Sequence, residues 1–228
     1  MTTEDIIELS EKLLLAVKME DSTEHFLDQL KGLNILDIKN NLTSDNKKKA
    51  FWINIYNSFY QILRKDLGVK KPQIFNKRLI DIADKKWSLD DVEHGILRKY
   101  RFKYSLGYWP QLFPSTVIKE LALSQIDYRI HFALNCGAKS CPPIAFYSVD
   151  KIDEQLEQST LSFLESETKI DSDKHQIHVT KLFLWFLADF GGMKGVRNIF
   201  EDKIKISTKG NKIVFQPYSW DEDLGNFG

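Results

Sequence analysis

The sequence predicts a soluble α+β protein, in which one helix-rich domain packs on a small, mainly antiparallel sheet. Helical patterns cluster early in the chain, whereas strand-like runs are interspersed and concentrate late, and no regular strand-helix alternation appears. No repeat, low-complexity stretch or flexible linker divides the 228 residues, and 43% of them are apolar, enough for one large core. We therefore expect a single domain over 1–228, with a helical extension over 1–45 and a core over 46–228.

The early part of the chain is predicted to be helical. Residues 3–31 have the apolar spacing of two short amphipathic helices broken at "EDST", and "GLNILDIKNNLTSDN" is typical of a polar connection. A longer helix is expected from roughly Asn46 to Leu67. Its apolar side includes Phe51 and Trp52, and its opposite side carries Asn54, Asn57, Ser58 and Gln61. That polar side either faces water or lines a cleft where carboxamides meet a ligand.

The middle of the chain is predicted to alternate between short elements. "RLIDIA" is strand-like, and "SLDDVEHGILRKY" is a helix that opens with Ser88 and Asp91 spaced as a capping box. In that helix Glu93 projects into the apolar stripe and needs a partner, for which Arg129 is one candidate, while His94 turns toward Asp90 and Arg98. The aromatic stretch 104–114 is expected to be an ordered loop against the core.

The later elements are predicted from shorter patterns. "YRIHFALN" alternates as a strand, with His131 and Asn135 on its polar face. A helix over "SVDKIDEQLEQSTLSFLES" and a strand over "HQIHVT" follow. "KLFLWFLADF" is then expected to be a buried helix that stops at Gly191 and Gly192. "KIKISTKGNKIVFQPYSW" is typical of a hairpin with a Gly-Asn turn.

Charge and cysteine usage limit the function classes. Lys plus Arg and Asp plus Glu each total 32, so the zero net charge disfavours nucleic acid as a partner. The acidic, amphipathic N-terminus resembles neither a signal peptide nor a membrane span, and two cysteines are few for a secreted chain. We expect a cytoplasmic protein that does not bind membranes, unless a natural leader has been replaced. The sequence does not indicate an oligomeric state.

The segment "RIHFALNCGAKSCPPI" holds the chain's two cysteines close to an imidazole. Gly137 permits a left-handed turn after Cys136, and two prolines stiffen the backbone after Cys141. The thiols are either packed and inert, joined in a local disulfide, bound to a metal, or reactive with His131 as their base. The His-x4-Cys-x4-Cys spacing matches no common zinc template, so we expect neither a metal nor a cofactor.

Three stretches, "FWINIYN", "SLDDVEHGILR" and "DYRIHFALNCGAKSCPPI", followed by "YSWDEDL", resemble the domain of unknown function 547 family. The resemblance covers roughly Lys47 to Leu224 and implies a fold more than an activity. The middle of the chain is also similar, more faintly, to the transglutaminase-like and papain-like cysteine hydrolases, in which a core helix begins with the nucleophile and a later strand carries the histidine. Here that helix has Trp52 and Asn54 near the expected position and no cysteine.

Two functional hypotheses follow from these patterns and resemblances. The first is a thiol hydrolase or acyl-transfer enzyme acting on an amide or peptide-like substrate, on a divergent papain-like or transglutaminase-like core. Its catalytic candidates are Cys136, Cys141, His131, His94 and Glu93. The second is a non-catalytic module that binds a small polar molecule or a peptide-like ligand. Its cleft would be lined by Asn54, Asn57, Arg98, Arg129 and His131. The residues expected to bind substrate are Asn54, Asn57, Arg98, Arg129 and Asn135. A purely structural role for all of these residues is the third possibility.

Overall fold

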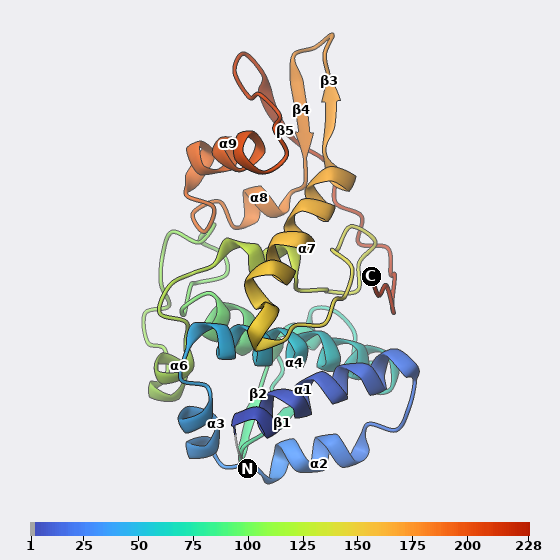
Figure 1. Cartoon of the computed structure of the whole chain (residues 1–228), viewed down its shortest axis with the longest axis vertical. Helices are drawn as coiled ribbons and strands as arrows, with labels where there is room; N and C mark the ends of the chain where they lie inside the picture. Colours follow the sequence, from blue (N-terminus) through green and yellow to red (C-terminus); the bar gives the residue numbers. More distant parts are fainter. Residues whose placement is uncertain (1–2) are drawn as a thin grey trace.

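Helix α4 (Asp45–Lys65) crosses the middle of the molecule, and the other elements surround it (Figure 1). In this view of the computed structural model, which describes residues 3–228, α1 (Thr3–Met19), α2 (Glu24–Gly32) and α3 (Ile35–Asn41) lie below α4. Helix α7 (Ile152–Glu167), α8 (Leu182–Trp185) and α9 (Gly192–Lys203) lie above it. Met1 and Thr2 are outside the described residues. They begin the N-terminal segment that was compared with a signal peptide in the sequence. The helix-rich α+β class is confirmed.

The polar side of α4 is buried, so the prediction of a water-facing stripe is wrong. The helix begins after Ser44, whose side chain accepts a hydrogen bond from the Lys47 amide, and every residue from 49 to 63 is buried. Asn54 donates to the Tyr147 carbonyl (2.8 Å) and accepts from the Tyr147 amide (3.1 Å). A buried carboxamide must find such partners, because leaving its donors and acceptors unpaired costs free energy. Helix α4 therefore fastens the segments around it.

The N-terminal helices are part of the same apolar core as α4. Two of them, α1 and α2, match the predicted pair, whereas α3 forms inside the stretch expected to be a polar connection. Asn34 and Asp37 start α3 with a reciprocal capping box. Ile6 and Leu13 of α1 are fully buried in one cluster with Trp52. Residues 1–45 are thus packed against the core as far as the described residues go, and do not project from it.

Two small sheets lie at opposite ends of the molecule (Figure 1). Strands β1 (Ile80–Ile82) and β2 (Lys85–Trp87) form an antiparallel hairpin where one strand was predicted. In the other sheet β4 (Gln176–Val179) lies between β3 (Lys169–Asp171), which is antiparallel to it, and β5 (Lys212–Phe215), which is parallel. Antiparallel pairing therefore predominates.

The predicted hairpin over residues 203–220 does not form. Only β5 is a strand in this segment, and it pairs with β4 instead of with the residues before it. The Arg197 guanidinium of α9 donates to the carbonyls of Thr208 (2.8 Å) and Asn211 (3.2 Å). These bonds hold the first half of the segment as a loop against α9, so its carbonyls are not free to pair with β5.

The helices in the middle of the chain are short, and one of them has unusually wide turns. Helix η1 (Asp91–Leu97) has wide turns, as in the bond from the Arg98 amide to the Glu93 carbonyl, and the predicted capping box between Ser88 and Asp91 is present. Helices α5 (Gln73–Asn76) and α6 (Thr116–Leu121) flank it in sequence. The loop over 104–114, expected to pack against the core, instead exposes Trp109 and Phe113.

Two predictions for the second half of the chain are corrected. "YRIHFALN" forms a 3₁₀ helix, η2 (Tyr128–Phe132), and another short one, η3 (Val149–Lys151), precedes α7. "KLFLWFLADF" forms only the single turn of α8. Gly191 (φ +80°) and Gly192 (φ +72°) take the left-handed conformation, and the unpredicted α9 begins there. None of the helices in the described part of the chain is long and apolar enough to cross a membrane.

We expect Asn57→Ala to destabilise the fold by about 2–4 kcal/mol, because it leaves two buried backbone groups without partners. The Asn57 carboxamide donates to the Ala133 carbonyl (3.0 Å) and accepts from the Asn135 amide (2.9 Å). Urea unfolding measures the loss. Asn40→Ala, at an exposed position of α3, is the control and should change stability by less than about 0.5 kcal/mol. Equal stability of the two variants would contradict the role given to this carboxamide.

Candidate active site

All five predicted catalytic side chains line one pocket of about 410 Å³, and they come from separate parts of the chain. Helix η1 supplies Glu93 and His94, η2 supplies His131, and the turn after η2 supplies the two thiols. Aromatic side chains form most of the remaining wall, with Phe75, Tyr104, Trp185, Phe186 and Trp220 among them. The pocket is therefore mainly apolar, with its ionisable groups gathered along part of the wall.

His131 is held in place by a buried carboxylate that the sequence patterns did not single out. Its Nε2 lies 2.9 Å from Oδ2 of Asp189, and its ring stacks on Phe186 with centroids 3.9 Å apart. Burial lowers the pKa of His131, although the Asp189 carboxylate opposes this shift. With Nε2–H donating to Asp189, the neutral ring keeps an unprotonated Nδ1, which has no hydrogen-bond partner among the described residues.

A buried arginine links Asp189 to the second imidazole. Arg98 donates from Nε to Oδ2 of Asp189 (2.6 Å), and both side chains are 0% exposed. Its Nη1 lies 2.9 Å from Nδ1 of His94, as expected from their spacing. Burial and the Arg98 charge lower the pKa of His94 well below its usual range. Gly107 (φ +85°) lies against this ion pair, where a Cβ would come within 2.4 Å of Asp189 Oδ1. No side chain fits there.

Glu93 lies at the pocket beside a phenol instead of in an ion pair with Arg129. The Tyr56 hydroxyl donates to Oε2 of Glu93 (3.2 Å). Burial raises the pKa of Glu93 to about 7, although the Arg98 charge opposes the shift. The candidate partner Arg129 binds Asp127 instead, and His94 is buried. Glu93 is therefore a carboxyl group that exchanges its proton near neutral pH.

The two thiols are free and lie beside the same tyrosine. Sγ of Cys141 lies 3.1 Å from the Tyr218 hydroxyl and 3.1 Å from the Cys136 amide, and Sγ of Cys136 lies 3.5 Å from that hydroxyl. Burial disfavours the Cys141 thiolate, but hydrogen bonds from Cys136, Tyr218 and the local backbone outweigh it and lower the pKa to about 6. The neighbouring sulfur and burial raise the pKa of Cys136.

The predicted turn after η2 is confirmed and is fixed by a carboxamide. Gly137 has the left-handed conformation (φ +63°). Asn135 donates to the Pro142 carbonyl (2.7 Å) and accepts from the Gly137 amide (2.8 Å), so its side chain closes the turn across the two cysteines. This is a positioning role, because Asn135 is buried and does not line the pocket.

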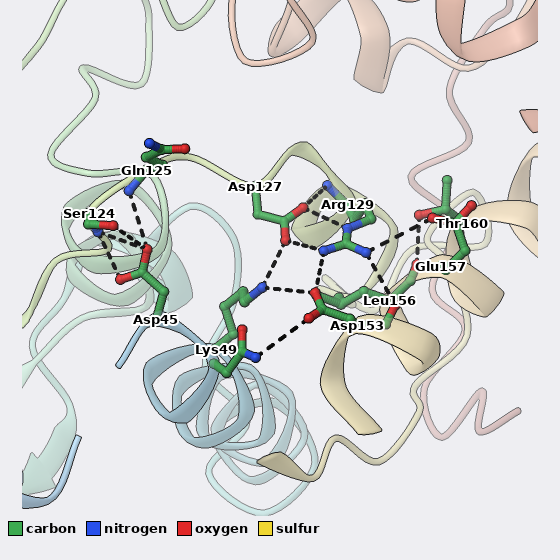
Figure 2. Close-up of polar contacts among 11 residues, drawn as sticks. Asp45, Lys49, Ser124, Gln125, Asp127, Arg129, Asp153, Leu156, Glu157 and Thr160 are labelled. Carbon is green, nitrogen blue, oxygen red and sulfur yellow. Dashed lines mark hydrogen bonds and ion pairs between the residues drawn. The ribbon is translucent and has the colours of Figure 1, made fainter. Parts of the chain in front are cut away.

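The other four residues expected to bind substrate also lie outside the pocket lining. The carboxamides of Asn54 and Asn57 are engaged with backbone groups, and Arg98 lies behind the imidazoles. Figure 2 shows Arg129 in a separate polar network, where it and Lys49 both bind Asp127 and Asp153. Asp127 also accepts from the Arg129 amide at the start of η2. The network therefore anchors to α4 the turn that presents His131.

Asp189, Tyr218 and Tyr56 are the functional candidates that sequence reasoning missed. The available signal for Asp189 was a carboxylate inside the apolar run "KLFLWFLADF", which must be paired if the run is buried. Tyr218 begins the "YSWDEDL" stretch of the family resemblance, but nothing in the sequence indicates that it reaches the thiols from a distant part of the chain. In the described part of the chain no cluster of three or more His, Cys, Asp or Glu side chains is arranged to hold a metal ion.

We expect Asp189→Ala to destabilise the protein by about 3–5 kcal/mol, because it leaves Arg98 charged, buried and unpaired. Thermal and urea unfolding measure the loss. Lys86→Ala is the matched control, since it breaks an exposed ion pair with Asp81 and should cost less than about 1 kcal/mol. A similar, small effect of both substitutions would show that the buried pair does not hold the pocket together.

Comparison with known proteins identifies a family without a described function. A family model for "Protein of unknown function, DUF547" matches residues 40–164. No curated protein and no solved structure matches the chain. The likeness to the transglutaminase-like and papain-like hydrolases therefore stays a prediction, and the strand expected to carry its histidine is a 3₁₀ helix. The matched residues contain Glu93, His94, His131 and both thiols, and they make up more than half of the chain, which belongs to the DUF547 family.

Proposed function

We propose that the protein is a cysteine-dependent hydrolase or acyl-transfer enzyme that acts on an amide or peptide-like substrate. The observation that carries the proposal is the convergence of a thiol, an imidazole and a carboxyl group in one pocket, with the imidazole oriented by buried Asp189. Nucleophilic catalysis needs a thiolate, a base and a third group that holds the base. Cys141, His131 and Asp189 are assigned these three roles.

Cys141 is preferred to Cys136 as the nucleophile. Its sulfur receives hydrogen bonds from the Cys136 amide and from Tyr218, which favour the thiolate. Cys136 lies next to that negative charge, which disfavours its own ionisation. The Cys136 amide that donates to the sulfur comes from a rigid turn closed by Asn135.

In the proposed reaction the Cys141 thiolate adds to the substrate carbonyl, and the C–N bond breaks to give a thioester. Glu93, which is partly protonated near neutral pH, gives its proton to the departing amine. His131 Nδ1 then takes a proton from water as the water attacks the thioester and Cys141 leaves as thiolate. Return of that proton from His131 to Glu93 completes the cycle. An attacking amine in place of water gives acyl transfer.

The pocket wall favours a peptide-like substrate over a small polar molecule. Trp185, Phe186 and Trp220 present ring surface next to the ionisable groups, and apolar walls with few polar groups are typical of sites that bury an apolar side chain. We therefore expect an aromatic or branched aliphatic group beside the reacting amide.

A non-catalytic binding protein is the second candidate function. It is favoured by one observation: between residues 3 and 228, no hydrogen bond joins either thiol to an imidazole. In this alternative the aromatic pocket holds the same class of ligand without turnover. Ligand binding that survives Cys141→Ser, together with no hydrolysis by the unmodified protein, would identify it.

We expect Cys141 to react with iodoacetamide at a rate that rises with pH around a midpoint near 6, as the thiolate forms. Tyr218→Phe removes a donor to that thiolate, so it should move the midpoint upward. Peptide mass spectrometry assigns the modified thiol. Tyr108→Phe, at an exposed tyrosine outside the pocket, is the control and should leave the midpoint unchanged. If neither thiol reacts with iodoacetamide until the protein unfolds, catalysis by Cys141 is excluded.

A screen of fluorogenic amides and thioesters with apolar side chains tests turnover directly. We expect Cys141→Ser and His131→Gln to lower kcat/KM by at least about 10³-fold, because each removes a group that takes part in bond making or proton transfer. His25→Gln, at an exposed histidine of α2, is the control and should retain full activity. Hydrolysis that persists in both pocket variants would overturn the assigned mechanism.

A further inference from the structure

We propose that Cys136 and Cys141 are a redox pair, in which a hydroperoxide oxidises Cys141 and Cys136 then closes a reversible disulfide. This inference concerns a modification site beyond the hydrolase proposal. It needs only the two thiols and their surroundings. A local disulfide was one of the states that the sequence left open for the cysteines. Here it is the oxidised form of the two thiols, which are free in the structure.

The two cysteine side chains are neighbours in the folded protein. Both sulfurs lie within 3.5 Å of the hydroxyl oxygen of Tyr218. The Cys136 amide also points at the Cys141 sulfur, at 3.1 Å. A disulfide needs two neighbouring cysteines, and these shared contacts place the two cysteine side chains next to each other in the turn.

Hydrogen bonds hold the turn that carries the thiols against the C-terminal segment. The Lys139 amide donates to the Asp221 carbonyl (2.8 Å), and the Asp223 amide donates to the Gly137 carbonyl (3.0 Å). The Ser219 amide donates to Ser140 Oγ (3.0 Å). These bonds keep the turn in one conformation, so the entropy of bringing the sulfurs together is already lost on folding.

The surroundings divide the two thiols into an attacking and a resolving member. Hydrogen bonds stabilise the thiolate at Cys141, whereas Cys136 stays protonated beside it. Redox-sensing cysteines commonly combine a low-pKa thiolate with a neighbouring thiol that captures the oxidised sulfur. Both thiols line the 410 Å³ pocket, which gives a small hydroperoxide a route to Cys141.

The chemistry balances with a hydroperoxide as oxidant. The Cys141 thiolate attacks the terminal peroxide oxygen, the O–O bond breaks, and the departing alkoxide takes a proton to become an alcohol, or water from hydrogen peroxide. Cys141 is then a sulfenic acid, oxidised by two electrons. The Cys136 sulfur attacks it, the S–O bond breaks, and the Cys136 proton leaves with the hydroxyl as water. A dithiol reductant restores both thiols by exchange.

Peptide mass spectrometry after treatment with hydrogen peroxide tests the proposal. We expect the unmodified protein to lose two hydrogens through a Cys136–Cys141 bond, and iodoacetamide labelling of both thiols to disappear and return after dithiothreitol. In Cys136→Ser the sulfenic acid should persist at Cys141, where dimedone traps it. Lys139→Ala changes an exposed residue between the thiols and should form the bond as the unmodified protein does.

Two outcomes would overturn the redox pair. One is unchanged labelling of both thiols after peroxide. The other is equal accumulation of sulfenic and sulfinic acid at Cys141 with and without Cys136. If Cys136→Ser does not fold, titration of the unmodified protein in dithiothreitol redox buffers decides the matter, since a redox pair shows a two-electron transition between dithiol and disulfide. A lack of amide turnover leaves this result unaffected, so failures of the two proposals can be told apart.

Discussion

The burial of α4 on all sides is the constraint on which the rest of the structure depends. The carboxamides of Asn54, Asn57 and Gln61 are buried, and they form hydrogen bonds inside the protein. They pair with segments that lack regular structure: Asn54 with Tyr147, Asn57 with the backbone on either side of Leu134, and Gln61 with the Gly225 amide. Buried backbone groups in irregular segments need partners as well. The two requirements satisfy each other, and the segments that carry His131 and the thiols are fixed in space as a result.

The same constraint explains which parts of the fold were predictable. Helices α1, α2 and α7 follow from apolar spacing, and the start of η1 follows from a capping box. The alternation in "YRIHFALN" failed because Ile130, His131 and Phe132 are all buried in η2, so the pattern does not separate an inner from an outer face. The helix pattern predicts a water-facing or ligand-facing Asn57 carboxamide, because its actual partners are backbone atoms, which a side-chain pattern does not reveal.

The candidate site was predictable in its residue types and not in its connections. A thiol pair and an imidazole within one short segment are visible in the sequence, and they share a pocket with Glu93 and His94. Their orienting partners, Asp189 and Tyr218, come from later segments of the chain that belong to the second apolar cluster, in which Phe132 packs with Phe183 and Phe190. Tertiary packing alone brings these residues together. Only a three-dimensional structure therefore shows that the His131 ring is hydrogen-bonded to the Asp189 carboxylate.

Arg98 connects the scaffold to the chemistry of the pocket. Its charge is satisfied by Asp189, and together with burial it disfavours protonation of both His94 and His131. The same buried environment raises the pKa of Glu93 against the opposing charge of Arg98. One pocket thus holds neutral imidazoles, which accept protons, beside a carboxyl group that still carries one near pH 7. Environments that move the pKa values of neighbouring groups apart in this way decide which group acts as the acid and which as the base. An arginine that never reaches the pocket surface therefore helps set the direction in which protons move within it.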